Sequence, residues 1–217
     1  MKTLALEFSS PQRSVAVLNP GTGSIAEVVD TASGHTMKPF ALIESALRQA
    51  GLEREQIETV VVGLGPGSYT GIRAAIALAQ GWQLARGVKL CGMSSVECLA
   101  TQEAAQGSTD KFNVVIDAQR GEFYLATYTI LSGKPKSNAP LQIVPLKAVQ
   151  QHEQVGGKII GPEVTKWFPN GRQTFPRAAT LAQLAAWNAT FVAGERLEPI
   201  YLRETAFVKT SGCLGRS

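Results

Sequence analysis

Residues 59–73 read TVVVGLGPGSYTGIR, in which an apolar run leads through a glycine-rich turn into a segment of helical composition. The uninterrupted apolar run 59–64 is typical of a strand that is buried on both faces of a parallel sheet. Residues 72–86 contain six alanines or glycines and only two charged residues, and Gly87 supplies a C-terminal stop. A strand that turns tightly into a helix predicts an α/β protein built around this parallel strand.

The flanking segments continue the alternation of strands and helices. Short β-rich segments broken by Ser-Pro and Asn-Pro-Gly predict an antiparallel meander of three strands before the first helix. In that helix Phe40, Ile43 and Leu47 recur at helical spacing, and Gly51 ends it. The elements expected before residue 106 span 3–9, 14–19, 24–30, 37–50, 59–64, 72–86, 89–92 and 94–105.

The second half of the chain repeats the plan of the first. Residues 113–127, like residues 3–17, form an apolar strand with one carboxylate, a turn containing Gln-Arg and a second apolar strand. We interpret this as an internal duplication and divide the chain into an N-terminal lobe, 1–105, and a C-terminal lobe, 106–217. Two such lobes meeting along a cleft are typical of the actin and sugar-kinase architecture, so the predicted fold class is a two-lobed, actin-like α/β fold with a duplicated ribonuclease H-like core. A loop-rich segment, a helix, a strand and an amphipathic helix are expected at 132–140, 145–154, 158–161 and 180–193.

Composition excludes several classes of protein. The chain has 217 residues, of which 44% are hydrophobic, and no apolar stretch approaches the roughly 20 residues of a membrane-spanning helix. Three cysteines without a CxxC pair argue against a disulfide framework. The two histidines, His35 and His152, are too far apart to form a metal pair within one helix. We therefore expect a cytoplasmic protein without a membrane partner and without a metal site of its own.

The formal net charge of +4 is concentrated in the second half, which holds 13 Lys and Arg against 8 Asp and Glu. These basic residues are scattered along the sequence and lack interleaved aromatics, which is typical of a generally solvated surface. Direct binding of nucleic acid by this chain is therefore only weakly predicted.

The glycine-rich turn admits two interpretations. A strand-to-helix junction exposes backbone N–H groups and the positive end of the helix dipole, so the turn could cradle an anion or a nucleotide phosphate. Alternatively, the glycines permit a tight turn, and a hydroxyl side chain caps a helix that packs very closely. The turn lacks the lysine of a Walker A loop and the context of a dinucleotide-binding motif. The residues of the cradle would be Gly65, Gly67, Ser68, Thr70 and Gly71.

Glu7 and Asp117 are the carboxylates that the first strand of each lobe offers. In two-lobed phosphotransferases, carboxylates at these places position a metal ion or a water near the phosphates. Glu7 is one methylene longer than an aspartate, which argues against a competent nucleotide-dependent enzyme. Ser68 and Thr70 are poor candidate nucleophiles, because neither histidine lies in a motif that would complete a Ser-His-Asp relay. We assign no catalytic residue and no metal ligand.

Helix 72–86 is apolar almost all round. A surface helix of a lone domain should carry a polar face about as wide as its apolar one. The helix is therefore either buried within its own lobe or packed between its own sheet and another subunit, beside helix 37–50. We favour the interface with another subunit.

The stretch GLGPGSYTGIR at 63–73 closely resembles the signature of the bacterial TsaB family, also called YeaZ, which acts in threonylcarbamoyladenosine modification of tRNA. Further stretches resemble that family across nearly the whole chain, at 1–19, 34–36, 116–124 and 198–203. One departure lies in the opening strand, which reads Leu6-Glu7-Phe8 where the family usually carries Asp followed by Thr or Ser. This departure weakens the case for nucleotide binding by this chain.

The resemblance implies a non-catalytic scaffold or activating subunit that binds the catalytic paralogue TsaD for modification of adenosine 37 in tRNA. It also implies that catalysis, ATP and metal belong to partner subunits, TsaD and the ATPase TsaE, and that tRNA is bound indirectly. A homodimer is an alternative for the chain on its own. Because the family pairs through helices of the N-terminal lobe, the resemblance places the interface on Phe40, Ile43, Leu47, Ile72, Ile76 and Ala79.

Two other functions are weighed against this one. The first is a small actin-like ATPase or phosphotransferase that uses Glu7, Asp117 and the turn 65–71. The second is a peptidase, in line with an older family label of glycoprotease, and it would require metal-binding histidines that the sequence does not offer.

Overall fold

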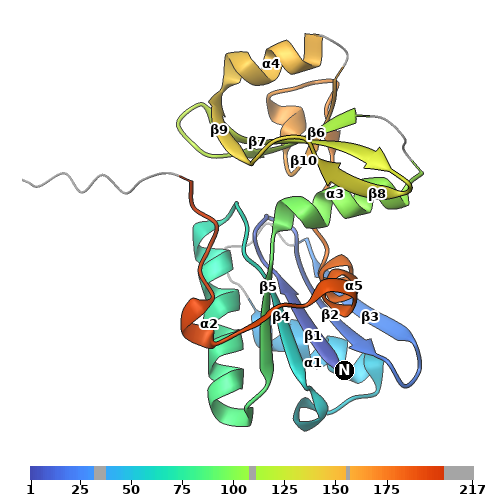
Figure 1. Cartoon of the computed structure of the whole chain (residues 1–217). Coiled ribbons are helices and arrows are strands. Elements are labelled where there is room, and N and C mark those ends of the chain that lie inside the picture. The colour runs from blue at the N-terminus through green and yellow to red at the C-terminus, as the bar shows by residue number, and fades with distance from the viewer. Residues whose placement is uncertain (32–37, 108–110, 155–156, 203–217) are drawn as a thin grey trace, which may run out of the picture.

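The computed structural model describes residues 1–31, 38–107, 111–154 and 157–202, which form two mixed β-sheets, one above the other in Figure 1. The strands of the first sheet are β1 (Thr3–Glu7), β2 (Arg13–Asn19), β3 (Ser24–Asp30), β4 (Thr59–Gly63), β5 (Lys89–Met93) and β12 (Phe191–Val192). The strands of the second sheet are β6 (Lys111–Asp117), β7 (Glu122–Leu131), β8 (Lys134–Ser137), β9 (Gln142–Pro145), β10 (Lys158–Gly161) and β11 (Arg172–Gln173).

The first sheet has the strand order β12-β5-β4-β1-β2-β3. The predicted meander is confirmed, since β1 pairs antiparallel with β2 and β2 with β3. The predicted inner strand is also confirmed, because β4 lies parallel to both β1 and β5 and all five of its residues are buried.

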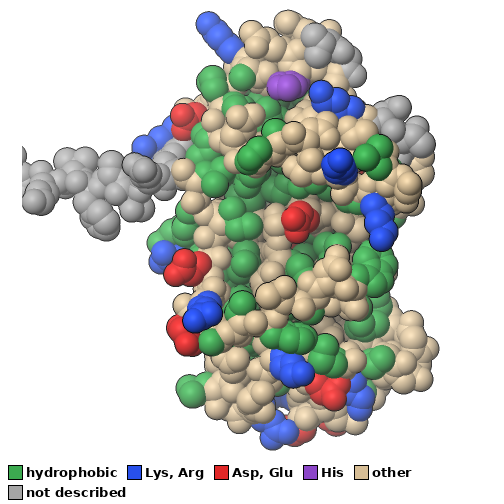
Figure 2. All heavy atoms as spheres, in the orientation of Figure 1, with side chains coloured by type: hydrophobic (Ala, Val, Ile, Leu, Met, Phe, Trp, Pro, Cys, Tyr) green, Lys and Arg blue, Asp and Glu red, His purple; other side chains and the backbone are tan. Residues whose placement is uncertain are grey.

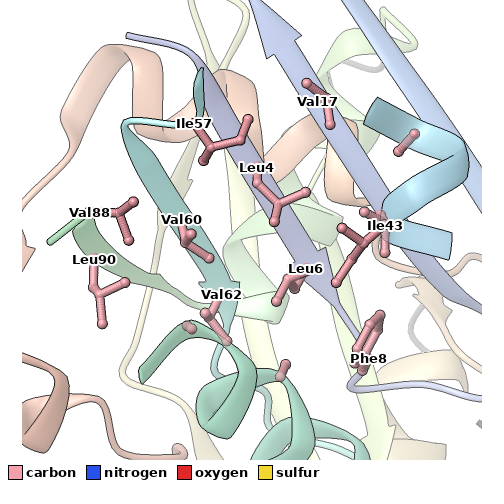
Figure 3. Close-up of a cluster of buried hydrophobic side chains, with 14 of the residues drawn as sticks. Leu4, Leu6, Phe8, Val17, Ile43, Ile57, Val60, Val62, Val88 and Leu90 are labelled. Atoms are coloured by element: carbon pink, nitrogen blue, oxygen red, sulfur yellow. The ribbon is translucent and has the colours of Figure 1, made fainter. Parts of the chain in front are cut away.

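Helices cover both faces of the first sheet. One face packs against α1 (Pro39–Ala50) and α2 (Tyr69–Arg86), and Figure 3 shows Leu4, Leu6 and Val62 in the resulting core. The other face packs against α5 (Ala178–Asn188) through small residues. Each leucine or valine buried in this way contributes roughly 1.5–3 kcal/mol, so the two helical layers hold β1 and β4 firmly in place.

The second sheet repeats the plan of the first. Its order is β11-β10-β6-β7-β8, in which β6 pairs antiparallel with β7 and parallel with β10, as β1 does with β2 and β4. The helix α3 (Ser95–Ala105) covers the inner face of this sheet, which is the face turned toward the first sheet in Figure 1. The helix α4 (Leu146–Gln154) and the short 3-10 helix η2 (Val164–Lys166) cover part of the opposite, outer face. The repeated strand order confirms the predicted two-lobed, actin-like α/β fold class.

Two element predictions are wrong. Residues 132–140, expected as a loop, contain the edge strand β8, which pairs with β7 although its sequence Lys-Pro-Lys-Ser is polar. The helix expected over 180–193 is α5, which begins at Ala178 and ends at Asn188, because residues 191–192 pair with the edge of the first sheet as β12. The first helix was expected from residue 37, which lies outside the described residues, and α1 begins at Pro39.

The division into lobes 1–105 and 106–217 stays a prediction, and the chain crosses between the two sheets in both directions. The helix α3 follows a strand of the first sheet but packs on the second, while α5 and β12 follow strands of the second sheet but belong to the first. In the described part of the chain, no helix combines the length and the apolar composition needed to cross a bilayer.

Candidate functional site

The glycine-rich turn joins the end of β4 to the start of α2. Ser68 is the N-cap of α2, and its hydroxyl oxygen accepts a hydrogen bond from the backbone N–H of Gly71 at 3.3 Å. The capping role that the sequence allows for Ser68 is therefore present, whereas Thr70 lies inside the first turn of the helix. This cap fixes the direction in which α2 leaves the sheet.

The turn packs against the segment that follows β1. A Cβ at Gly67 would lie 2.0 Å from the carbonyl oxygen of Ser9, and a Cβ at Gly71 would lie 2.0 Å from that of Phe8. The backbone N–H of Ser68 donates to the Ser9 carbonyl at 2.7 Å. The chain's own backbone therefore needs these two glycines, which supports the close-packing interpretation. Anion binding at the turn stays a prediction.

The Glu7 carboxylate lies buried beneath this turn and is tied to three elements. Its Oε1 accepts the backbone N–H of Ser9 at 2.7 Å, and its Oε2 accepts the Ser95 hydroxyl at 2.8 Å. The same hydroxyl oxygen accepts the backbone N–H of Gly65 at 3.2 Å. Gly63 leaves the space that the carboxylate fills, since a Cβ there would lie 2.1 Å from Oε2. Glu7 thus links the end of β1, the glycine-rich turn and the start of α3.

Burial raises the pKa of Glu7 above its ordinary value, and the hydrogen bonds from Ser9 and Ser95 oppose this rise only in part. The unfolded chain releases the proton at an ordinary pH of about 4.3, whereas the folded chain holds it to higher pH. Protonation therefore favours the native state, and this stabilisation is lost as the pH rises through the folded pKa.

We expect Glu7→Gln to remove the contribution of Glu7 to the pH dependence of stability just above pH 4.3. The free energy of unfolding of the wild type, measured relative to that of the variant, should fall as the pH rises through this window, since a glutamine does not titrate. Urea unfolding at a series of pH values measures the difference. Glu195→Gln, at an exposed glutamate, controls for the loss of one charge. Parallel profiles of the free energy of unfolding against pH for the wild type and Glu7→Gln would contradict the raised pKa of Glu7.

Asp117 occupies the corresponding place at the end of β6. Its Oδ1 accepts the backbone N–H of Gln119 at 2.7 Å, as Glu7 accepts that of Ser9. Gln119 and Arg120 both adopt left-handed backbone conformations, with φ of 67° and 61°. Each of the two carboxylates therefore binds the backbone of the turn that follows its own strand, which is a further sign of the duplication.

The remaining chemically reactive residues do not converge. Among the described residues, no group of three or more His, Cys, Asp or Glu is arranged to hold a metal ion. His152 lies in the last turn of α4, while His35 and Cys213 fall outside the described residues. Cys91 and Cys98 are buried free thiols, and burial raises the pKa of both.

The interface assignment stays a prediction, and the structure shows how accessible its six residues are in the chain on its own. Ile43, Leu47, Ile72, Ile76 and Ala79 are buried in the chain's own core, because α1 and α2 turn these side chains toward the sheet. Of the six predicted residues, Phe40 alone is exposed, by 67%. The apolar character of the two helices that suggested an interface is thus explained largely by packing within the lobe.

An apolar pocket of about 260 Å³ nevertheless opens beside Phe40, between α1, α2 and the 3-10 helix η1 (Arg54–Gln56). An ion pair between Arg54 and Glu44 lies at its edge. The sequence did not indicate the contributions of Arg54 and Glu55, because nothing in its periodicity places η1 beside the two helices. The pocket is lined by Phe40, Ile43, Glu44, Arg54, Glu55, Trp82, Ala85 and Arg86.

Comparisons with known proteins agree with this geometry. The family model of TsaD, described as tRNA N6-adenosine threonylcarbamoyltransferase, matches residues 26–202. The tRNA threonylcarbamoyladenosine biosynthesis protein TsaB of Escherichia coli is 27% identical over 94% of this chain and 95% of its own length. The TsaB protein of Bacillus subtilis is 26% identical over 67% of this chain and 63% of its own length.

A solved structure of YeaZ from Pseudomonas aeruginosa shares the fold. It superposes with a TM-score of 0.75 at 22% sequence identity, covering 93% of this chain and 99% of that chain. A second solved structure, of an uncharacterised protein with similarity to the peptidase YeaZ from Pseudomonas aeruginosa, gives a TM-score of 0.77 at 23% identity. The glycine-rich turn and the duplicated sheets agree with what these relatives show. The chain belongs to the TsaB (YeaZ) family of tRNA threonylcarbamoyladenosine biosynthesis and carries a domain of the TsaD type.

Proposed function

We propose that this chain is a non-catalytic subunit that binds a TsaD-like paralogue and activates it for modification of adenosine 37 in tRNA. The observation that carries the proposal is the exposed apolar surface on α1 and α2, where Phe40 borders a pocket lined by apolar and charged side chains. A large aromatic side chain at the edge of an apolar pocket is typical of an interface anchor.

The region beneath the glycine-rich turn supports a role without catalysis. The carboxylate of Glu7 is fully buried and already accepts hydrogen bonds from Ser9 and Ser95. The turn itself is packed against the backbone of residues 8–9. Both features favour a site that holds the fold together, and they support the placement of ATP and metal on the partner subunits, TsaD and TsaE. In this proposal the assembled complex binds tRNA, and a homodimer forms when the partner is absent.

Phe40→Asp tests the proposed interface. We expect this substitution to weaken binding to the TsaD-like paralogue by about 10–100-fold, because it places a charge in the desolvated centre of the contact. Isothermal titration calorimetry with the purified paralogue measures the affinity. The fold should be unaffected, since the side chain is 67% exposed.

Trp187→Asp is the matched control for this experiment. Trp187 is also 67% exposed, but it lies on α5, which covers the opposite face of the first sheet. This variant should bind the paralogue as the wild type does. Equal affinities of Phe40→Asp and the wild type would contradict the interface, and magnesium-dependent ATP turnover by the isolated chain would favour the phosphotransferase alternative.

A further inference from the structure

One end of the outer face of the second sheet is left uncovered. At the start of β7 the side chains on the outer face, Phe123 and Leu125, are buried under α4 and η2. Farther along the strand the side chains on the same face are accessible, namely Thr127, Thr129 and Leu131. The inward-facing side chains of the same stretch stay buried against α3. The change therefore reflects the end of the helical cover and not the end of the sheet.

Three exposed lysines occupy this uncovered end. The register places Thr129 between Lys111 of β6 and Lys136 of β8, so the three side chains form a row on one face of the sheet. Lys134 lies two residues before Lys136 and therefore points to the same face, opposite Leu131. Strand spacing puts the backbones of Lys111 and Lys136 about 10 Å apart and those of Lys134 and Lys136 about 7 Å apart. We call Lys111, Lys134 and Lys136 the lysine patch.

The lysine patch differs from the other basic residues of the second half, several of which are held in ion pairs. Lys158 and Arg172 both bind the buried carboxylate of Glu103 on α3. Arg177 binds Glu27 of the first sheet. Within the described residues, by contrast, the three lysines of the patch form no ion pair. In Figure 2, blue side chains lie on the side of the upper lobe where Figure 1 places β8.

Neutral hydrogen-bonding groups lie among these charges. The Thr129 hydroxyl oxygen accepts a hydrogen bond from the Asn138 side chain at 3.0 Å, which leaves its own proton free to be donated. Lysines combined with threonine and asparagine are the side chains that contact phosphate and sugar oxygens in nucleic-acid interfaces.

Lysines on an edge strand can also prevent two sheets from pairing edge to edge, and Pro135 in β8 serves the same purpose. That explanation does not extend to Lys111, since β6 is a central strand with neighbours on both sides. Lys111 is aligned with Lys136 across the face of the sheet, not along its edge. The row therefore calls for a ligand that lies over the face.

We propose that the lysine patch binds the phosphate backbone of the RNA substrate directly while the complex acts on it. The proposal rests on the proposed function, because it takes the RNA to be the tRNA that the complex modifies. The scattered positions of these lysines in the sequence had suggested a solvated surface, and the pairing of β6, β7 and β8 brings them together. The patch contributes position and affinity without reading the base sequence.

The test compares the wild-type complex with a triple variant, Lys111→Gln, Lys134→Gln and Lys136→Gln. Fluorescence anisotropy with a labelled, unmodified tRNA transcript gives the affinity at a series of KCl concentrations. Each phosphate contact contributes about 0.7–0.9 to the slope of log K against log salt, so the variant should show a slope smaller by about 2–3. Its affinity at low salt should fall by about 10-fold or more.

A second triple variant, Lys2→Gln, Lys89→Gln and Arg196→Gln, removes the same charge away from the second sheet and should keep the wild-type slope. An unchanged slope in the patch variant would overturn the inference. Aggregation of that variant together with an unchanged slope would show that the lysines serve only to prevent edge-to-edge pairing of sheets. Binding of the patch to phosphatidylglycerol vesicles in preference to tRNA would also overturn the inference. Assembly with the paralogue is followed separately by size-exclusion chromatography, so a failure of the proposed function is distinguished from a failure of this inference.

Discussion

Gly67→Ala is expected to destabilise the chain by roughly 3–5 kcal/mol, a large part of the stability of a typical domain. The backbone of Gly67 has φ of 149°, which side-chain-bearing residues rarely adopt, and a Cβ would lie 2.0 Å from the Ser9 carbonyl oxygen. Strained backbone and overpacking each cost about 1–3 kcal/mol. Because the atom in the way belongs to the backbone, relief requires the end of β1 to move. Urea unfolding monitored by circular dichroism measures the loss.

Gly81→Ala provides the control for this substitution. Gly81 lies in the interior of α2, and a Cβ there would meet nothing within 4 Å. Alanine should therefore stabilise the helix by about 0.5–1 kcal/mol. The same chemical change thus has opposite signs at two positions 14 residues apart. A Gly67→Ala variant as stable as the wild type would show that the turn is not packed against residues 8–9.

Ile76→Glu is expected to unfold the chain or to cost about 4 kcal/mol of stability. Ile76 is 6% exposed and belongs to the core that α1 and α2 form with the first sheet. A carboxylate at this place would be removed from water without a partner. Thermal unfolding in the absence of any partner measures the effect. Any loss of paralogue binding by this variant would follow from the unfolding of its own lobe.

Leu84→Glu is the matched control on the same helix. Leu84 is 91% exposed, so this change should alter the free energy of unfolding by no more than about 0.5 kcal/mol. An Ile76→Glu variant that kept its wild-type stability would restore Ile76 to the partner surface, contrary to the burial seen in the structure.

Much of the fold could be predicted because short stretches of the sequence determine its strands, turns and helices locally. The apolar run 59–64, the glycine-rich turn and the alanine-rich helix after it mark a strand, a turn and a helix without reference to the rest of the chain. The repeat of a carboxylate before a Gln-Arg turn pointed to the duplication, and the strand orders of the two sheets agree with it. The strand β8 was missed because its polar sequence has no apolar face, and pairing with β7 alone makes it a strand.

The candidate site was predicted less well, since its residues depend on contacts that are distant in sequence. Glu7 was singled out as a carboxylate near phosphates, but its partner Ser95 lies 88 residues away and was not foreseen. Two serines in succession before a helix, Ser94 and Ser95, are the signal that could have suggested it, because a single hydroxyl suffices for the cap. The apolar composition of α2 indicated that the helix would be covered, but it did not show whether its own sheet or another subunit would cover it. In the structure the first sheet covers Ile72, Ile76 and Ala79.

The return of α5 and β12 to the first sheet affects how the chain is made on the ribosome. When residue 105 emerges, the face of the sheet that carries Ala5, Ala16 and Val61 is still bare, because α5 covers it in the finished protein. About 70 further residues must be translated before α5 appears, which takes several seconds at about 5–20 residues per second. The nascent N-terminal half therefore keeps this apolar face of the first sheet exposed, where chaperones can bind it, until the second sheet and α5 have been synthesised.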